Sequence, residues 1–259
     1  MKKQANRKAA ANPEATWFGY QQVSACEKTN RVKGVFSSVA KNYDLMNDLM
    51  SLRIHRLWKK ALLHAINPKA DERFLDVAGG TGDIALSILK KTGGAATVTV
   101  CDLNPDMLAV GRDRATDRGW FKAKIDWVEG NAEDLPFEAR LFDVYTIAFG
   151  LRNVTHIDRA LADAARVLKP GGRFYCLEFA PVEAEPLKQV YDFYSFTILP
   201  WLGEAVAKDR ASYQYLAESI RQFPAPDKLA SRLAAVGFGE VRYTRLTGGI
   251  AVLHEAIRL

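Results

Sequence analysis

The stretch FLDVAGGTGDIAL, residues 74–86, decides the fold of this chain. The apolar residues on either side of Asp76 are typical of a short buried strand, and IALSILKK (84–91) is typical of the start of a helix. The glycines between them predict a tight loop of the kind that holds a nucleotide-bearing cofactor. The spacing is a variant of G-x-G-x-x-G, because Ala85 stands where the third glycine would be.

The rest of the chain repeats this alternation between a strand-like and a helix-like pattern of apolar residues. Further strands are expected at 97–103, 125–130, 142–149 and 173–179. Helices are expected between them, one with Asn104 as its N-cap and another opened by a capping box at Thr155 to Asp158. The chain closes with a helix over 227–237 and two strands around Thr247 to Gly249. Strands alternating with helices predict an α/β fold with a mostly parallel sheet covered on both faces.

Two segments stand outside this alternation. Residues 34–66 predict one or two helices, and an aromatic segment after residue 182 is too long for a simple connection, so a helical insertion is expected there. We therefore expect one domain over 34–259 that follows a basic, disordered tail. Its parts are lid helices (34–70), a cofactor-binding core (71–182), a helical substrate insertion (183–225) and a C-terminal helix with a strand pair (226–259).

Composition excludes several classes of protein. Residues 1–33 hold seven basic and two acidic side chains, a net charge of +5, which leaves +1 of the total of +6 for residues 34–259. A near-neutral body disfavours nucleic-acid binding. Three widely spaced cysteines and four scattered histidines indicate neither a disulfide framework nor a metal site. With no secretory signal and no run of 18 apolar residues, we expect a cytoplasmic protein.

The predicted strand ends assemble a nucleoside site. Gly79, Gly80 and Gly82 follow the first strand, and Asp102 follows the second, where an acid can accept hydrogen bonds from both ribose hydroxyls. A purely structural alternative is that the glycines make a turn and Asp102 caps the next helix. These residues do not separate NAD from S-adenosylmethionine, but Asp76 before the loop suits a cationic, amino-acid-bearing cofactor better than a pyrophosphate.

Longer strings resemble the class I S-adenosylmethionine-dependent methyltransferases and, more narrowly, the UbiE-type ubiquinone/menaquinone biosynthesis C-methyltransferases. The narrower resemblance covers the chain from about residue 35 and rests on VFSSVAKNYDLMNDLMSLRIHRLWK (35–59), FGLRNVTHIDRAL (149–161) and YQYLAESIRQFP (213–224). It implies a Rossmann-like methyltransferase sheet with an antiparallel C-terminal strand. It implies S-adenosyl-L-methionine as cofactor, with contacts at Thr81, Asp102, Asn131 and Ala132. Ala148 departs from the serine that the family often has there, so that hydroxyl contact would be missing.

The resemblance also implies the substrate, a polyprenylated quinol methylated on a ring carbon. A guanidinium beside the quinol oxygen would favour the phenolate, so Arg152 is the first catalytic candidate, with Asn153 fixing the geometry. Alternatively, Arg152 pairs with Glu133 or Asp134 and only shapes the loop. His156 is a second candidate for the base. Tyr43 is expected over the methionine moiety or, alternatively, in the core.

The aromatic insertion and the N-terminal helices are expected to form the quinol entrance. A peripheral contact with the inner face of the membrane and membership of a quinone-biosynthesis assembly stay open. One alternative is a class I methyltransferase acting on a sterol, a phospholipid amine or a phenol. Another is an NAD-dependent oxidoreductase, which Asp102 permits although no Tyr-x-x-x-Lys pair is present.

Overall fold

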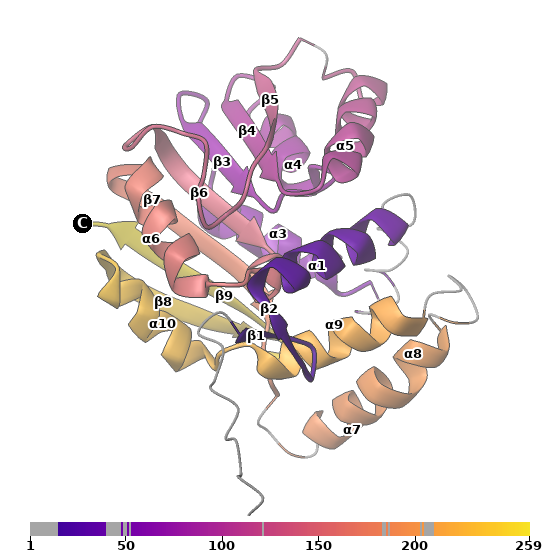
Figure 1. Ribbon diagram of the computed structural model, residues 1–259. Coiled ribbons are helices and arrows are strands. Elements are labelled where there is room, and N and C mark those ends of the chain that lie inside the picture. The colour runs from indigo at the N-terminus through magenta and orange to yellow at the C-terminus, as the bar shows by residue number, and fades with distance from the viewer. Residues whose placement is uncertain are drawn as a thin grey trace, which may run out of the picture.

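A seven-stranded sheet forms the centre of the computed structural model, which describes residues 15–39, 48, 51, 53–120, 122–182, 185, 187–202, 204 and 210–259. The strand order is β5-β4-β3-β6-β7-β9-β8 (Figure 1). The strands are β3 (Arg73–Val77), β4 (Thr97–Asp102), β5 (Ile125–Glu129), β6 (Phe142–Ala148), β7 (Leu168–Phe179), β8 (Phe238–Leu246) and β9 (Ala251–Arg258). The strands β3 to β7 pair in parallel, and β9 runs antiparallel to β7 and β8. The predicted α/β architecture is confirmed.

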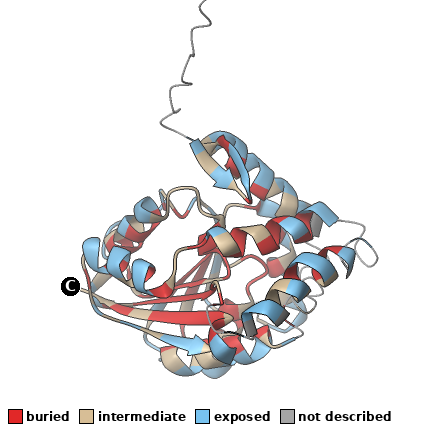
Figure 2. Ribbon diagram, turned by 90° about the horizontal axis from the view of Figure 1, so that it is seen from below, coloured by how far each residue is buried: buried red, intermediate tan, exposed pale blue. Residues whose placement is uncertain are grey.

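Helices cover both faces of this sheet. One face packs against α3 (His55–Ile66), α4 (Asp83–Lys91) and α5 (Pro105–Asp117), the other against α6 (Ile157–Val167) and α10 (Pro226–Ala235). Successive residues of a strand point to opposite faces, so Phe74 belongs to the first core and Leu75 to the second. Most residues of the middle strands β3 and β6 are therefore buried (Figure 2). This explains why their sequences are continuous apolar runs.

The first residues of α5 and α6 can be compared with the two predicted helix caps. The Asn104 side chain accepts hydrogen bonds from the backbone N–H groups of Asp106 and Met107, and this N-cap is confirmed. The capping box at Thr155 is wrong, because α6 begins at Ile157 and the side chain of its N-cap residue makes no capping hydrogen bond. Instead, a carboxylate from another loop accepts from the backbone: Glu133 Oε1 lies 2.9 Å from Thr155 N and 3.1 Å from His156 N.

The predicted disordered tail is wrong for residues 15–33. They form an antiparallel pair, β1 (Ala15–Phe18) and β2 (Gln21–Ser24), followed by α1 (Ala25–Val39). Tertiary contacts hold this segment: the Phe18 ring stacks on Tyr215 at 4.0 Å, and the buried Lys28 ammonium donates to the Val154 carbonyl. The charge of Lys28 is therefore buried rather than solvated. The rest of the predicted tail, residues 1–14, lies outside the described residues.

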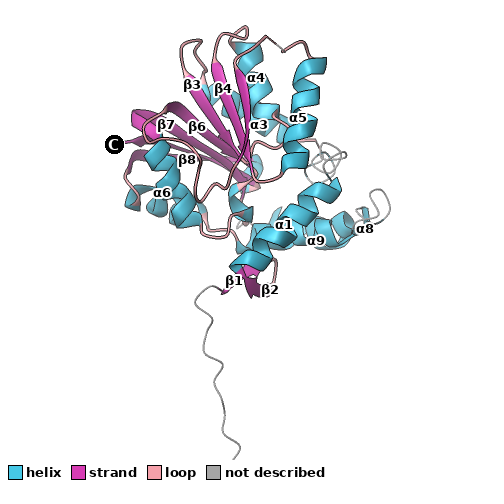
Figure 3. Cartoon of the chain, turned by 45° about the horizontal axis from the view of Figure 1, so that its top comes forward, coloured by secondary structure: helices cyan, strands magenta, loops and turns pink. Residues whose placement is uncertain are grey.

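The segment after β7 is helical, as predicted. It contains α7 (Leu187–Phe193), a π-helical turn η3 (Tyr194–Ile198), α8 (Leu199–Leu202) and α9 (Arg210–Gln222). Tyr213 and Tyr215 on α9 are buried, whereas Phe193, Phe196 and Trp201 are exposed. Among the described residues, no helix combines the length and hydropathy needed to cross a bilayer. Figure 3 shows α1 and α9 together beyond one end of the sheet, where they cover the loops that build the site.

Candidate active site

A cavity of about 680 Å³ lies at the carboxyl ends of β3, β4, β5 and β6. The strand order reverses between β3 and β6, and this is where open α/β sheets bind ligands. The loops supply Val77, Ala78, Gly80, Asp102, Leu103, Asn104, Met107, Gly130, Asn131, Ala132, Phe149, Gly150, Asn153 and Val154, and α1 adds Val32, Lys33 and Phe36. We call this the cofactor cavity.

The glycine loop brings the backbone close to this cavity. Gly80 has φ +53° and donates its N–H to Asp102 Oδ2 at 2.8 Å, so the loops after β3 and β4 are joined. A Cβ at Gly79 would lie 2.7 Å from Val100 Cγ1 and 2.9 Å from Asp76 O. Gly82, with φ +78°, packs against Trp127 and is not among the lining residues, so its part is to turn the chain into α4.

Asp102 lies in the cofactor cavity as predicted. Its Oδ1 accepts from Asn104 N at 2.9 Å and its Oδ2 from Gly80 N. Burial is the larger influence and raises the pKa of this carboxyl, against the hydrogen bonds from the two backbone N–H groups. Each carboxylate oxygen has a further lone pair, so Asp102 can shape its loop and accept from a ligand hydroxyl as well.

The loop after β5 brings two more predicted residues to the cofactor cavity, Asn131 and Ala132. Asn131 Oδ1 accepts from Glu133 N at 3.0 Å, which fixes the orientation of the amide. An amide held in this way presents its N–H donors in a defined direction. The loop can therefore offer polar groups to the edge of a base.

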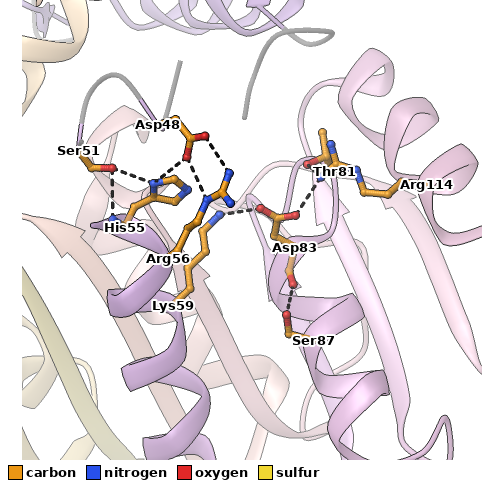
Figure 4. Close-up of polar contacts among 9 residues, drawn as sticks. All are labelled: Asp48, Ser51, His55, Arg56, Lys59, Thr81, Asp83, Ser87 and Arg114. Carbon is orange, nitrogen blue, oxygen red and sulfur yellow. Dashed lines mark hydrogen bonds and ion pairs between the residues drawn. The ribbon is translucent and has the colours of Figure 1, made fainter. Parts of the chain in front are cut away.

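A smaller cavity of about 320 Å³ continues beyond Ala78 and Phe149, which line both cavities. We call it the inner cavity; its other lining residues are Lys59, Asp76, Gly79, Thr81, Asp83, Ile84 and Ala148. Ala148, where the family often has serine, thus faces this space without a hydroxyl. Thr81 Oγ1 accepts from Arg114 at 3.0 Å, so its hydroxyl is held by α5 (Figure 4).

Asp76 is the unusual group of the inner cavity. Its Oδ1 accepts from Thr146 Oγ1 at 2.7 Å, whereas its buried Oδ2 has no hydrogen-bond partner among the described residues. Burial raises the pKa of Asp76 to about 7. An unpartnered buried carboxylate favours a cationic group beside it and disfavours a pyrophosphate. Asp76 is therefore a candidate partner for the ammonium group of S-adenosylmethionine.

The structure places Arg152 away from the cofactor cavity. Its Nη1 lies 2.6 Å from Glu178 Oε1 and donates to the Phe149 carbonyl, and both charged side chains are buried. The alternative of an ion pair that shapes the loop is right in kind, but its predicted partners, Glu133 and Asp134, are wrong. The residues come together only because β7 places Glu178 beside the loop after β6.

Arg152 lines a separate cavity of about 550 Å³ between the N-terminal strands, α1 and α9. We call it the neighbouring cavity. Within the part of the chain that the structure describes, Arg152 Nε is buried without a hydrogen-bond partner. Lys28 and Tyr215 line the same space. Asn153 lines the cofactor cavity, and its Oδ1 accepts from the Tyr215 hydroxyl at 3.0 Å. The predicted pair Arg152 and Asn153 therefore serves two adjoining cavities.

Two histidines, His156 and His55, line none of these cavities. His156 is the N-cap residue of α6. His55 is buried with Nδ1 2.8 Å from Ser51 Oγ, and burial lowers its pKa to about 4. Tyr43 lies outside the described residues.

Sequence reasoning missed Lys28 and Lys59 altogether. In the sequence, both resemble ordinary lysines on amphipathic helices. Only the packing of these helices against the rest of the chain brings the two side chains to the cavities. For the face of α1 that lines the cofactor cavity, the sequence held only a weak indication. Val32 and Phe36 are four residues apart, so they would share one face of a helix.

Comparison with known proteins agrees with this geometry. Residues 24–258 match the model of the ubiE/COQ5 methyltransferase family. The chain is 53% identical over 249 residues to the ubiquinone/menaquinone biosynthesis C-methyltransferase UbiE of a Bradyrhizobium strain, covering 95% of this chain and 98% of that protein. It is 48% identical over 267 residues to the mitochondrial 2-methoxy-6-polyprenyl-1,4-benzoquinol methylase of rice, Oryza sativa, covering 97% and 91%.

The fold has solved counterparts. A SAM-dependent methyltransferase from Aquifex aeolicus superposes with a TM-score of 0.57 at 15% identity, covering 78% of this chain and 89% of that one. The sheet, the cavity at its switch point and the family match agree with one another. The chain belongs to the ubiE/COQ5 methyltransferase family and is an S-adenosylmethionine-dependent C-methyltransferase.

Proposed function

We propose that this enzyme methylates a ring carbon of a polyprenylated quinol. The candidate substrates are demethylmenaquinol, 2-polyprenyl-6-methoxy-1,4-benzoquinol, or both. The names of its relatives support this substrate class. The observation that carries the proposal is structural: the cofactor cavity and the neighbouring cavity, which Arg152 and Lys28 line, adjoin at Val154.

The cofactor residues of this proposal line two cavities that share Ala78 and Phe149. Asp102 and the Asn131–Ala132 pair would hold the adenosine end in the cofactor cavity, with the backbone of Gly79 and Gly80 close to the ligand. Asp76 would hold the amino group of the methionine end in the inner cavity. When bound, the cofactor supplies a methyl group on a sulfonium, which an electron-rich ring carbon can attack. Gly82 and Thr81 would shape the loop that carries Gly79 and Gly80. The contact of Tyr43 with the methionine moiety stays a prediction.

The substrate side would use the neighbouring cavity. A quinol is reactive at carbon when its oxygen is a phenolate, and buried donors lower the free energy of that anion. Glu178 already neutralises Arg152, so Arg152 would act through its unpartnered Nε–H rather than through a net charge. Lys28 would contribute the charge, and Asn153, held by Tyr215, would orient the ring.

The direct test uses purified enzyme, methyl-labelled S-adenosylmethionine and each reduced quinol in turn. We expect one labelled methyl on a ring carbon of the product, identified by mass spectrometry and NMR. Arg152→Ala should lower turnover while the affinity for S-adenosylhomocysteine is largely kept. If neither quinol is labelled under reducing conditions, the proposed substrate class is wrong.

The prenyl tail needs an apolar surface, and the insertion offers one. Phe193, Phe196 and Trp201 are 61%, 38% and 62% exposed, on the segment from α7 to α8. We propose that this surface contacts the lipid from which the substrate is drawn, because exposed aromatic groups bind the membrane interface. Vesicle flotation tests it: Phe193→Ser/Trp201→Ser should lose binding to lipid vesicles. Leu57→Ser, which removes an equally exposed residue on α3, should keep it.

A further inference from the structure

Lys28 on α1 is a buried lysine at the boundary between the cofactor cavity and the neighbouring cavity. Its Nζ donates to the Val154 carbonyl at 2.9 Å, and Val154 lines both cavities. The lysine itself lines the neighbouring cavity. A quinol ring can reach the cofactor only at this boundary, so a quinol oxygen on the side of the neighbouring cavity would come close to the amine.

The amine of Lys28 has few partners for a buried cation. Within the described residues, the bond to Val154 is its one hydrogen bond, and it makes no ion pair with a carboxylate there. Burial lowers the pKa of Lys28 to about 8, against the raising influence of Glu133. A fraction of the side chain is therefore neutral amine at neutral pH. A neutral amine can keep its N–H bond to Val154 and accept a proton with its lone pair.

The other titratable groups around the neighbouring cavity are poorly suited to accept a proton. Among its described lining residues they are Arg152 and Tyr215, while β1 and α6 contribute uncharged side chains. Arg152 stays protonated and is paired with Glu178. Burial raises the pKa of Tyr215, whose hydroxyl already donates a hydrogen bond. Glu133 does not line this cavity, and its Oε1 already accepts from two backbone N–H groups at the start of α6.

We propose that Lys28 is the catalytic residue that accepts the hydroxyl proton of the quinol. This inference rests on the proposed function, which brings the quinol ring to the boundary of the two cavities. The lone pair of the amine takes the proton, so the O–H bond breaks and an N–H bond forms. The products are a phenolate and an ammonium group. The ammonium group then supplies the positive charge beside the phenolate oxygen.

The protons and electrons of the whole reaction balance with Lys28 in this role. An electron pair of the phenolate ring forms the new carbon–carbon bond, and the pair of the broken carbon–sulfur bond stays on sulfur. The methylated ring carbon loses its hydrogen as a proton to water, and the pair of that C–H bond restores the aromatic ring. Lys28 returns its proton to the oxygen. One proton is released for each methyl transferred, which equals the positive charge lost at sulfur.

The first test is the pH dependence of kcat, measured with labelled cofactor and reduced quinol, both saturating, in the absence of oxygen. The wild-type kcat should rise roughly tenfold per pH unit and level off above the pKa of Lys28. Lys28→Met should lower kcat by about 10²- to 10⁴-fold, the usual contribution of a general base, and lose the slope. Lys28→Arg keeps the charge but cannot accept a proton, so its turnover should be equally slow.

A second readout requires no turnover. The probe is a nitro-substituted methoxyphenol, whose phenolate absorbs visible light, titrated into protein saturated with S-adenosylhomocysteine. The wild type and Lys28→Arg should both lower the apparent pKa of the bound probe, because both offer a cation to the phenolate. Lys28→Met should not. Arg31→Met, which removes an exposed cation of the same helix, should leave the kcat profile and the probe spectra unchanged.

The decisive result is the contrast between probe and turnover in Lys28→Arg, a variant that keeps the cation next to the boundary. Retained probe ionisation with lost turnover supports proton acceptance. Turnover close to that of the wild type, with the pH slope intact, would show that only the charge matters and would overturn the inference. An unchanged profile in Lys28→Met would overturn it too. If the wild type labels no quinol at all, the proposed function itself fails before any variant is compared.

Discussion

The ammonium group of Lys28 lies 2.9 Å from the carbonyl oxygen of Val154, and this hydrogen bond ties α1 to the loop between the cofactor cavity and the neighbouring cavity. The same helix covers the cofactor cavity with Val32 and Phe36. Its other end is held where the Asn104 amide donates to the Lys33 carbonyl and to Ser37 Oγ. Cofactor access thus depends on a segment whose charges suggested a solvated tail.

Lys28 should make stability depend on pH in the alkaline range. Burial lowers its pKa to about 8, against the raising influence of Glu133. An unfolded lysine has a pKa of about 10.4, so between about pH 8 and pH 10 the unfolded chain binds more protons at this side chain than the folded chain does. The contribution of Lys28 to the unfolding free energy should therefore rise with pH. Urea unfolding of wild type and Lys28→Met checks this: their difference should change across the range, and a constant difference contradicts it.

Arg152 and Glu178 should behave as a coupled buried pair. Arg152→Met leaves a buried carboxylate without its partner, which should cost about 3–5 kcal/mol of unfolding free energy. The double variant Arg152→Met/Glu178→Leu removes both charges and should be more stable than Arg152→Met alone. Urea denaturation of the wild type, Arg152→Met, Glu178→Leu and the double variant gives the coupling energy. Additive effects would show that the ion pair is not what holds the loop after β6.

Cofactor affinity should depend on the ionisation of Asp76. Burial raises its pKa to about 7, and a cationic amino group binds the ionised form better. Affinity for S-adenosylhomocysteine should thus increase as pH rises toward 7 and then level off, with up to about a tenfold change per pH unit below the pKa. Calorimetry between about pH 5.5 and 8 measures it. Asp76→Asn, which can still accept from Thr146, should bind more weakly and lose this dependence; a retained slope would assign it to another group.

Two glycine-to-alanine variants should act in opposite directions. A Cβ at Gly79 would meet Val100 and the backbone of Asp76 at less than 3.0 Å, so Gly79→Ala should cost about 1–3 kcal/mol of stability and weaken cofactor binding. Gly34 lies within α1, and apart from its own helix turn no atom of the described residues lies within 4 Å of an added Cβ. Gly34→Ala should stabilise the protein by about 0.5–1 kcal/mol. Thermal melts with and without S-adenosylhomocysteine compare them, and equal effects would refute the close approach at Gly79.

The sequence by itself determined the local structure and the class of cofactor. The apolar run before Gly79 predicts a buried strand from its own residue types, and the glycines after it predict a turn. Asn104 caps a helix with its own side chain. Asp102 follows a strand whose neighbours run parallel, so its place at the edge of the sheet follows from the alternation of strands and helices. These inferences held because the interacting groups are close in sequence or share one repeating unit.

Only the tertiary structure decided which charges meet. Glu133 caps α6 in place of Thr155, Arg152 pairs with Glu178 rather than with an acid of its predicted neighbourhood, and Lys59 reaches the inner cavity from α3. Long charged side chains gain their partners through packing of distant segments, and no local pattern encodes that choice. The burial that leaves Asp76 Oδ2 unpartnered is likewise a property of the assembled sheet.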